Sequence, residues 1–502
     1  MRPAGLYARH RFWLLPAITI AGLGLIWLAD NDFEVDSGLY AGVAWGMVAS
    51  GDWWTPRAGD LAYFNKPPLV LWVHAAFMWA TRPLFDAAGE GLPPLWVVKV
   101  PVLAQAAFAV GASAVAARRL AGPKVGLHAG LMLALSLPFI LHLDRAIMDY
   151  AVVGFMMLAV AWVARGDELG SRWRLVGSGV WIGLALLCKP FFALLGVPLV
   201  MAWLGLRGRW RALPWVGLSV VVAAAVAAPW HVSMALLHGE AFTSQYLGRE
   251  TVSRGLGGGG YVFEPWWSYL WYIAREFWPW NIPLALGLIE AARRTRRQGL
   301  GRSARGVSFA LVWSVGWLTM LAAFGDKRPR YMMHVWPALA LPASIWVARW
   351  APTGLRGTGT KRLAWLPRGA VAAGVIAQAL PILPRSPRDP RYARIAELVE
   401  RMPPDVELWN GTLMPDRTGS IALTAGVWPK GFHHCPFAHG GRMPPEGDWV
   451  LWHADRLGTL GITPDAAGGH PAVIELIDDY ALLRWRGGFA RRLRGEVVSD
   501  EP

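Results

Sequence analysis

The first residues that could do chemistry form a cluster of carboxylates at the end of the first apolar run. The stretch LADNDFEVDSGLY (28–40) carries Asp30, Asp32, Glu34 and Asp36 in a chain whose formal net charge is +15. A carboxylate beside a bound substrate can take the proton of an attacking hydroxyl group and so act as a general base. The question is which acid reacts and which are only solvated charges.

A second candidate lies between two later apolar runs, in the stretch LHLDRAIMDYAV (141–152). Asp149 falls just inside the second run, where an unpaired carboxylate is costly. Arg145 precedes it by four residues, so on a helix the two side chains would share a face and could pair. The two residues either form part of a site or make no more than an ion pair at the membrane surface.

Basic residues recur at the same ends of the apolar runs. Lys189 ends the run LLCKPFF, and Lys327 and Arg330 lie in FGDKRPRYMMHVWP, at the start of another run. Guanidinium and ammonium groups bind phosphate well, so an anionic ligand at the membrane surface would explain these charges. The alternative is that the lysine only snorkels and that the others are stray interfacial cations.

The composition shows which elements must position these residues. Of 502 residues, 54% are hydrophobic and only 17% are charged, and many apolar runs are long enough to cross a membrane. The chain is therefore predicted to be a polytopic α-helical membrane protein. Its basic excess is mostly arginine between the apolar runs, which membrane topology explains better than nucleic-acid binding does. Two cysteines give no disulfide framework.

Charge distribution predicts the topology. The predicted spans are 12–29, 95–117, 125–143, 147–163, 175–188, 190–206, 212–230, 265–290, 307–325, 331–348 and 369–384. The stretch 67–80 is short and opens with two prolines, so we expect an interfacial helix rather than a span. With these eleven spans every arginine and lysine cluster between runs falls on the side of the N-terminus, which is then cytoplasmic by the positive-inside rule.

The C-terminal part has a different composition. The stretches DVELWN, DWVLWHA and YALLRW alternate like strands, and RYARIAELVERM has a helical pattern. We therefore predict two domains, a transmembrane domain over 1–384 and a small α/β domain over 385–502 on the outer face. The stretch FHHCPFAH (432–439) is better explained as a coincidence than as a metal site. The metal ligands are unknown, and a divalent metal ion is left open.

The outer-loop motifs resemble those of the GT-C glycosyltransferases, in the PMT-like branch of protein O-mannosyltransferases and lipid A aminoarabinose transferases. The first outer loop of that family has an Asp-Glu-x-x-Tyr core, a LASGDW stretch and an aromatic-x-Lys-Pro-Pro ending. The matching stretches here are Asp36-Ser-Gly-Leu-Tyr40, VASGDW (48–53) and YFNKPPL (63–69). Later elements match at Arg145 with Asp149, at Lys189, at Pro229-Trp230, and at Lys327 to Tyr331. Ser37 departs from the family, which usually has Glu there.

The resemblance implies an inverting glycosyltransferase that moves a sugar from a polyprenyl-phosphate carrier to a lipid or protein acceptor. Asp36 is the implied base, with Asp149, oriented by Arg145, as its partner. The implied phosphate ligands of the donor are Lys66, Lys189, Arg254, Lys327, Arg330 and Tyr331. Supporting roles fall to Glu34, Tyr40, Tyr63 and His231. The implied location is the bacterial inner membrane, with the C-terminal domain in the periplasm.

A different class of function remains open, a transporter or flippase of lipid-linked substrates. Such a protein would also be polytopic and would carry charges within the membrane. Transporters, however, tend to place their polar residues at the bilayer midplane on broken helices. In this sequence the informative charges gather at the ends of the apolar runs.

Overall fold

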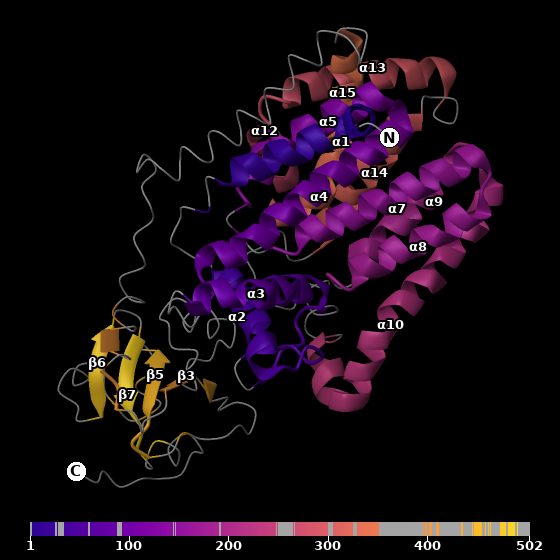
Figure 1. The fold of residues 1–502 in the computed structure, drawn as a ribbon. Coiled ribbons are helices and arrows are strands. Elements are labelled where there is room, and N and C mark those ends of the chain that lie inside the picture. Colours follow the sequence, from indigo (N-terminus) through magenta and orange to yellow (C-terminus); the bar gives the residue numbers. More distant parts are fainter. Residues whose placement is uncertain are drawn as a thin grey trace. The chain divides into compact units, whose positions relative to one another are not determined.

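The computed structural model describes most of the first 350 residues and separate stretches of the C-terminal part (Figure 1). The described residues are 3–25, 28, 35–58, 61–87, 93–143, 145, 147–189, 192–246, 248, 265, 267–299, 305–324, 329–350, 394, 397–398, 401–403, 408–410, 433–434, 444, 446–453, 457, 460, 462, 472–477, 480–486 and 489. The chain divides into two compact units, of which one contains 1–29, 64–70 and 99–383, and the other 30–63, 71–98 and 384–502.

The first unit is helical. Its helices are α1 (Pro3–Gly24), most of α4 (Leu95–Ala121), α5 (Pro123–Ala134), α6 (Leu137–Ile140), α7 (Asp149–Leu169), α8 (Arg172–Leu186), α9 (Phe192–Leu206), α10 (Leu213–Thr243), α12 (Ser268–Glu276), α13 (Asn281–Gln298), α14 (Arg305–Ala323) and α15 (Trp336–Trp350). Two short 3₁₀ helices, η2 (Trp210–Ala212) and η4 (Pro329–His334), precede α10 and α15. α8 packs against both α7 and α10 (Figure 1).

Several of these helices are long and apolar enough to cross a membrane. Among the described residues, the segments that meet this test are Trp96–Ala121, Asp149–Leu169, Trp210–Tyr246 and Arg305–Ala323. Phe12–Gly24 and Phe192–Leu206 are apolar but shorter. Their length and apolar composition agree with the prediction of a multi-pass helical membrane protein.

Glycines let the helices of this unit approach closely. A Cβ atom at Gly179 of α8 would lie 2.1 Å from the carbonyl oxygen of Ser219 on α10, and one at Gly183 would lie 2.6 Å from Val226 Cβ. Small residues spaced by four bring helix backbones together in membranes, where van der Waals packing rather than water exclusion drives association. The sequence GVWIG of α8 therefore explains its contact with α10.

The predicted spans differ from the observed helices in three places. The span 265–290 is wrong, because α12 ends at Glu276 and α13 begins at Asn281, with Pro279 between them. Proline has no N–H group to donate to the preceding turn. The span 125–143 is divided into α5 and α6, with Pro138 in the first turn of α6. The stretch between the predicted spans 212–230 and 265–290 is helical up to Thr243, because α10 continues past Trp230. The span 369–384 lies outside the described residues.

The second unit contains the elements of the first loop. Its helices are α2 (Val35–Ser50) and residues 71–87 of α3 (Leu69–Ala87), and a two-residue hairpin pairs β1 (Arg57–Ala58) with β2 (Leu61–Ala62). The Trp72 indole Nε1 donates to the carbonyl oxygen of Trp53 at 2.6 Å, and its ring stacks with that of Trp54. These contacts attach the SGDWW stretch to α3.

The C-terminal part of this unit contains a five-stranded mixed sheet in the order β4-β3-β5-β7-β6 (Figure 1). The strands are β3 (Leu408–Asn410), β4 (His433–His434), β5 (Trp449–His453), β6 (Val473–Ile477) and β7 (Tyr480–Arg484). β3 pairs in parallel with β4 and β5, whereas β7 pairs antiparallel with β5 and β6. Three strands lie where alternation predicts them, and Val450, Trp452, Ala481 and Leu483 face one core.

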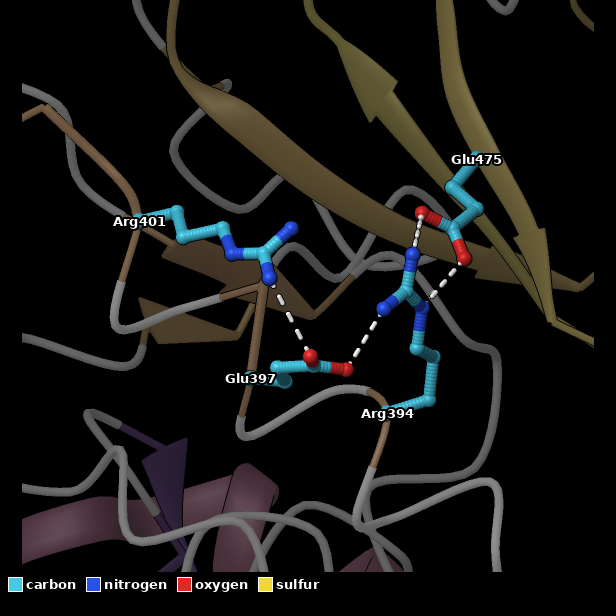
Figure 2. A network of polar contacts seen from close by, with 4 residues as sticks. All are labelled: Arg394, Glu397, Arg401 and Glu475. Carbon is cyan, nitrogen blue, oxygen red and sulfur yellow. Dashed lines mark hydrogen bonds and ion pairs between the residues drawn. The ribbon is translucent and has the colours of Figure 1, made fainter.

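An ion-pair network holds the segment before the sheet to strand β6 (Figure 2). The Arg394 guanidinium donates to both carboxylate oxygens of Glu475, at 2.5 and 2.8 Å, and to Glu397 at 2.5 Å. Arg401 donates to the other oxygen of Glu397 at 3.1 Å. Arg394 holds the pKa of Glu397 below its ordinary value. Because these side chains are exposed or half-exposed to water, we expect the network to fix orientation more than it stabilises the fold.

Candidate functional site

A buried ion pair lies at the N-terminal end of α7. Lys189 Nζ donates to Asp149 Oδ1 at 2.7 Å, and the two side chains are only 10% and 5% exposed. Two charges taken out of water are stable together, but each is costly without the other. The pair therefore marks a place where the chain tolerates charge in an apolar interior, which is typical of functional sites in membrane proteins.

Local structure explains where these two residues lie. Asp149 is the first residue of α7, where the partial positive charge of the helix N-terminus favours a carboxylate. α8 ends at Leu186, and Lys189 follows in a turn whose Leu187 carbonyl oxygen accepts a hydrogen bond from Leu69 N at 2.9 Å. The KPPL segment is thus joined by its backbone to the segment that carries Lys189.

His334 is the third member of this group, and it was not among the residues predicted from the sequence. Its Nε2 atom lies 3.4 Å from Asp149 Oδ1, and its side chain is fully buried. The imidazole ring stacks on Trp317, with 5.3 Å between centroids, and Trp313 Nε1 donates to the His334 carbonyl oxygen at 2.9 Å. The available signal was a histidine three residues after Tyr331, at the start of an apolar run.

Two aromatic rings cover the lysine. Lys189 Nζ lies 4.5 Å from the centroid of Phe192 and 5.1 Å from that of Tyr331, within the range of cation–π attraction. Burial lowers the pKa of Lys189 to about 8, although the neighbouring Asp149 carboxylate acts in the opposite direction. The positive charges of Arg330 and Lys66 lower this pKa further.

The structure therefore brings several predicted phosphate ligands into one neighbourhood. Arg330 acts electrostatically on both Asp149 and Lys189, and Tyr331 lies over the lysine. An excess of positive charge around one carboxylate suits an anion that carries more than one negative charge. Arg254 and Lys327, which complete the predicted group, lie outside the described residues.

Lys66 lies in a segment held by the end of α10. Its Nζ donates to the Asn65 carbonyl oxygen at 3.0 Å, and Gln245 Nε2 donates to Asn65 Oδ1 at 2.7 Å. The ring of Phe64 contacts His238 and Phe242 of α10. The extension of α10 beyond the predicted span thus supplies the surface on which residues 64–66 rest.

His231 belongs to this extension of α10. Its Nε2 lies 2.7 Å from the Tyr246 hydroxyl, and its Nδ1 lies 2.8 Å from the Ala227 carbonyl oxygen. The side chains of Trp230 and Phe242 pack around the same hydroxyl-bearing ring. These contacts give His231 a place in an aromatic cluster at the end of α10.

The expectation that Arg145 and Asp149 share a helix face is wrong. α7 begins only at Asp149, and Arg145 lies in the preceding turn, where its backbone N donates to the His142 carbonyl oxygen at 3.2 Å. The ion-pair partner of Asp149 is Lys189, which is 40 residues further along the chain. Sequence spacing could not reveal this pairing, because it depends on how α7 and α8 pack together.

The remaining predicted residues belong to the second unit. Asp36 lies in the first turn of α2, and Tyr40 on the same helix is buried, as is Ser37. Tyr63 is buried as well, and its backbone N donates to the Pro56 carbonyl oxygen at 2.7 Å. Glu34 lies outside the described residues. Among the residues that the structure describes, no group of three or more His, Cys, Asp or Glu could hold a metal ion.

Comparison with known proteins shows a likeness to membrane glycosyltransferases. Residues 65–232 match the family model described as dolichyl-phosphate-mannose-protein mannosyltransferase. An undecaprenyl phosphate-alpha-4-amino-4-deoxy-L-arabinose arabinosyl transferase of Edwardsiella ictaluri is 28% identical over 325 residues, 63% of this chain and 56% of that protein. Its counterpart in Pseudomonas paraeruginosa is 27% identical over 343 residues, 66% of this chain and 59% of that protein. The chain thus spans less than two thirds of the length of these relatives.

Solved structures extend the likeness to the fold. The crystal structure of ArnT from Cupriavidus metallidurans bound to undecaprenyl phosphate matches with a TM-score of 0.67 at 20% identity, covering 95% of this chain and 98% of that one. The Archaeoglobus fulgidus oligosaccharyltransferase AglB matches with a TM-score of 0.53 at 13% identity, covering 89% of this chain and 70% of that one. The resemblance drawn from the sequence is confirmed, and the fold is that of the GT-C glycosyltransferases.

Proposed function

We propose that this chain, which resembles GT-C glycosyltransferases in fold and in sequence, transfers a sugar from a polyprenyl-phosphate carrier to an acceptor at the outer face of the inner membrane. The printed names of its relatives describe arabinosyl transferases that act with undecaprenyl phosphate, and one similar structure holds that lipid phosphate. We further propose a pentose as the sugar and lipid A as the first acceptor to test. A protein hydroxyl is the second acceptor, in line with the family model.

The observation that carries the proposal is the arrangement of Lys189. A lysine ammonium has three N–H donors, and Asp149 takes one of them. The ion pair holds the side chain in a single orientation, so the other donors are already positioned when the phosphate of the donor arrives. Asp149 is then a positioning residue that keeps Lys189 charged and oriented, and His334 supports the same carboxylate.

The proposed reaction is a single displacement at the anomeric carbon. An oxygen of the acceptor attacks this carbon, the bond to the polyprenyl phosphate breaks, and the configuration inverts. Asp36 takes the proton of the acceptor, a contribution of about 10²–10⁴-fold for a general base. Lys66, Lys189 and Arg330 stabilise the charge that develops on the departing phosphate. Arg254 and Lys327 are proposed to complete this group.

The topology proposed for this reaction has an N-terminus in the cytoplasm and a small α/β domain in the periplasm. Asp149 begins α7 and Lys189 follows α8, so the ion pair lies at the ends of two helices rather than at the middle of a span. This position favours chemistry at a membrane surface over the transporter alternative, whose substrate sites lie near the bilayer midplane.

The test is a transfer assay in proteoliposomes with an undecaprenyl-phosphate-linked aminoarabinose donor and purified lipid A. We expect the unaltered chain to form the modified lipid, detected by mass spectrometry, and Asp36→Asn to lose at least about a hundredfold in rate. Asp86→Asn is the matched control, because Asp86 is an exposed carboxylate paired with Arg82 on α3. Near-normal turnover by Asp36→Asn would remove the residue from the proposed role of base.

A further inference from the structure

An arginine-lined recess lies at the end of α7 opposite to Asp149. Its walls are the last turn of α4, the turn that joins α4 to α5, Glu168 of α7 and Arg305 at the start of α14. Its volume of ≈ 460 Å³ falls within the range of about 300–1,000 Å³ found for small-molecule sites. α7 has 21 residues, so about 30 Å separate the recess from the candidate site.

Positive charge dominates this recess. Arg118, Arg119 and Arg305 line it, and the charges of Arg165 and Arg174 act on Arg119. Arg207 and Arg209 extend the cluster toward α10, because the charges of Arg305 and Arg209 both act on Arg207. Like charges gathered in one place repel each other, so an anion bound among them would be stabilised.

Two carboxylates offset part of this charge. Glu168 lies 3.0 Å from Arg165 Nη1 and 3.9 Å from Arg305 Nη2, so one acid is shared between two arginines. Asp167 is bound by Arg209, which donates to both its carboxylate and its backbone carbonyl oxygen. The seven arginines of the cluster therefore exceed its two carboxylates by five.

Two of the lining guanidinium groups are held in fixed orientations. Arg305 Nη2 donates to the Arg119 carbonyl oxygen at 2.5 Å, and the Arg118 guanidinium lies 4.3 Å from the centroid of the Phe12 ring. Both side chains are half-buried rather than freely solvated. Planar guanidinium groups fixed in this way offer paired N–H donors that match the oxygens of a phosphate.

The surroundings of the cluster match the edge of a membrane. Trp173, which lies between Arg172 and Arg174, is 86% exposed, and Trp210, next to Arg209, is 66% exposed. Exposed tryptophans of this kind are typical of the membrane–water interface. Since α4, α7 and α14 are candidate membrane spans, the recess opens at the depth where lipid headgroups lie.

We infer that this recess binds the phosphate of an anionic membrane lipid, with Arg118, Arg119 and Arg305 as its ligands. A lipid is favoured over free phosphate because its acyl chains can lie along the apolar helices while its headgroup enters the recess. Basic pockets between membrane helices bind the headgroups of anionic lipids in this way. The site is separate from the proposed transfer site, so either can fail without the other.

The experiment is native mass spectrometry of the full chain, released from detergent in the presence of cardiolipin, phosphatidylglycerol or zwitterionic phosphatidylcholine. We expect bound cardiolipin and phosphatidylglycerol in the unaltered chain, with little phosphatidylcholine. Arg118→Gln with Arg305→Gln should weaken binding of the anionic lipids about tenfold or more, because charge-assisted hydrogen bonds are lost. The single variant Arg118→Gln is measured as well, because replacing Arg305 also removes its hydrogen bond to the backbone of α4. A loss of binding in the single variant therefore does not depend on that hydrogen bond.

Two further variants separate the recess from net charge. Arg211→Gln changes the net charge as Arg118→Gln does, but Arg211 is an exposed residue outside the recess, so binding should not change. Glu168→Gln removes the carboxylate from the recess, and we expect lipid binding to rise by about threefold. Millimolar inorganic phosphate should displace little cardiolipin.

Three results would overturn the inference. Equal lipid binding by the unaltered chain, by Arg118→Gln and by the double variant Arg118→Gln with Arg305→Gln would show that the recess is not the binding site. An equal loss in Arg211→Gln would show that net charge alone attracts the lipid. Full displacement of cardiolipin by inorganic phosphate would show a site for a free anion rather than for a lipid.

Discussion

The two ends of α7 carry the same kinds of residue in opposite environments. At Asp149 the carboxylate is 5% exposed and is paired with Lys189, whereas at the other end Glu168 is 44% exposed and shared between two arginines. Both ends look alike in the sequence, as charges beside an apolar run. The two ends therefore differ in burial rather than in residue type. The buried ion pair is the one proposed to take part in chemistry, and the exposed one is a surface ion pair.

The strongest way to test this contrast is to remove the buried carboxylate. Asp149→Asn leaves the Lys189 ammonium buried without its counter-charge, which should destabilise the protein by about 3–5 kcal/mol and abolish transfer. Thermal unfolding in lipid nanodiscs and the proteoliposome assay measure the two effects. An unchanged melting temperature would show that the pair is solvated and that the contrast between the two ends is wrong.

A double variant separates stability from function at the same place. Asp149→Leu with Lys189→Met replaces both charges by apolar side chains of similar size, and such replacements are often neutral or stabilising. We expect the melting temperature to recover toward that of the unaltered chain, whereas transfer stays lost. Recovery of transfer in this variant would show that the pair has only a structural role.

The contrast also shows how far the sequence could lead. The stretch from Asp36 to Lys66 and the residues Lys189 and Tyr331 could be selected because their types and spacing match a family pattern. Apolar runs likewise predicted most of the helices. These signals depend on residues that are close together in the chain, and such information is fully present in a single sequence.

Long-range pairing was not predictable in the same way. Arg145 was chosen as the partner of Asp149 by its spacing, but α7 starts only at Asp149, and Lys189 reaches the carboxylate from the end of another helix. His334 was missed for the same reason, since its contact with Asp149 arises from packing. The length of α10 was misjudged because HVSMALLHGEAFT mixes polar with apolar residues and reads as a loop.

The carboxylate of Asp167 allows a test at an intermediate degree of burial on α7. Asp167 is 5% exposed but its partner Arg209 is 50% exposed, so water screens one side of the pair. Asp167→Asn should therefore destabilise the protein by about 1.5 kcal/mol, the low end for hydrogen bonds to charged groups, and leave transfer unchanged. Arg209→Gln should give a similar loss in the same unfolding assay, and a loss of transfer in either variant would contradict the separation of the two ends.

The pH dependence of transfer tests the charge on the buried lysine. In the proposed reaction Lys189 must be protonated to stabilise the departing phosphate. Its pKa is lowered to about 8, and the ionisable groups around it are Asp149, His334, Arg330 and Lys66. The protonated form is present below that pH and is lost above it, so kcat/KM should fall about tenfold per pH unit on the alkaline side. Lys189→Arg stays charged and should lose this alkaline fall, even if its rate is lower. The same fall in Lys189→Arg would assign it to another group.

The smallest effect is expected at the exposed end of α7. Glu168→Gln removes a carboxylate from Arg165 and Arg305, but both contacts are open to water, so stability should change by less than about 1 kcal/mol. Salt screens such pairs, so the change should shrink as ionic strength rises, whereas the loss in Asp149→Asn should hardly depend on it. Unfolding of both variants at low and high salt measures this difference. A large, salt-independent loss of stability for Glu168→Gln would contradict the prediction that the exposed carboxylate contributes less to stability than the buried one.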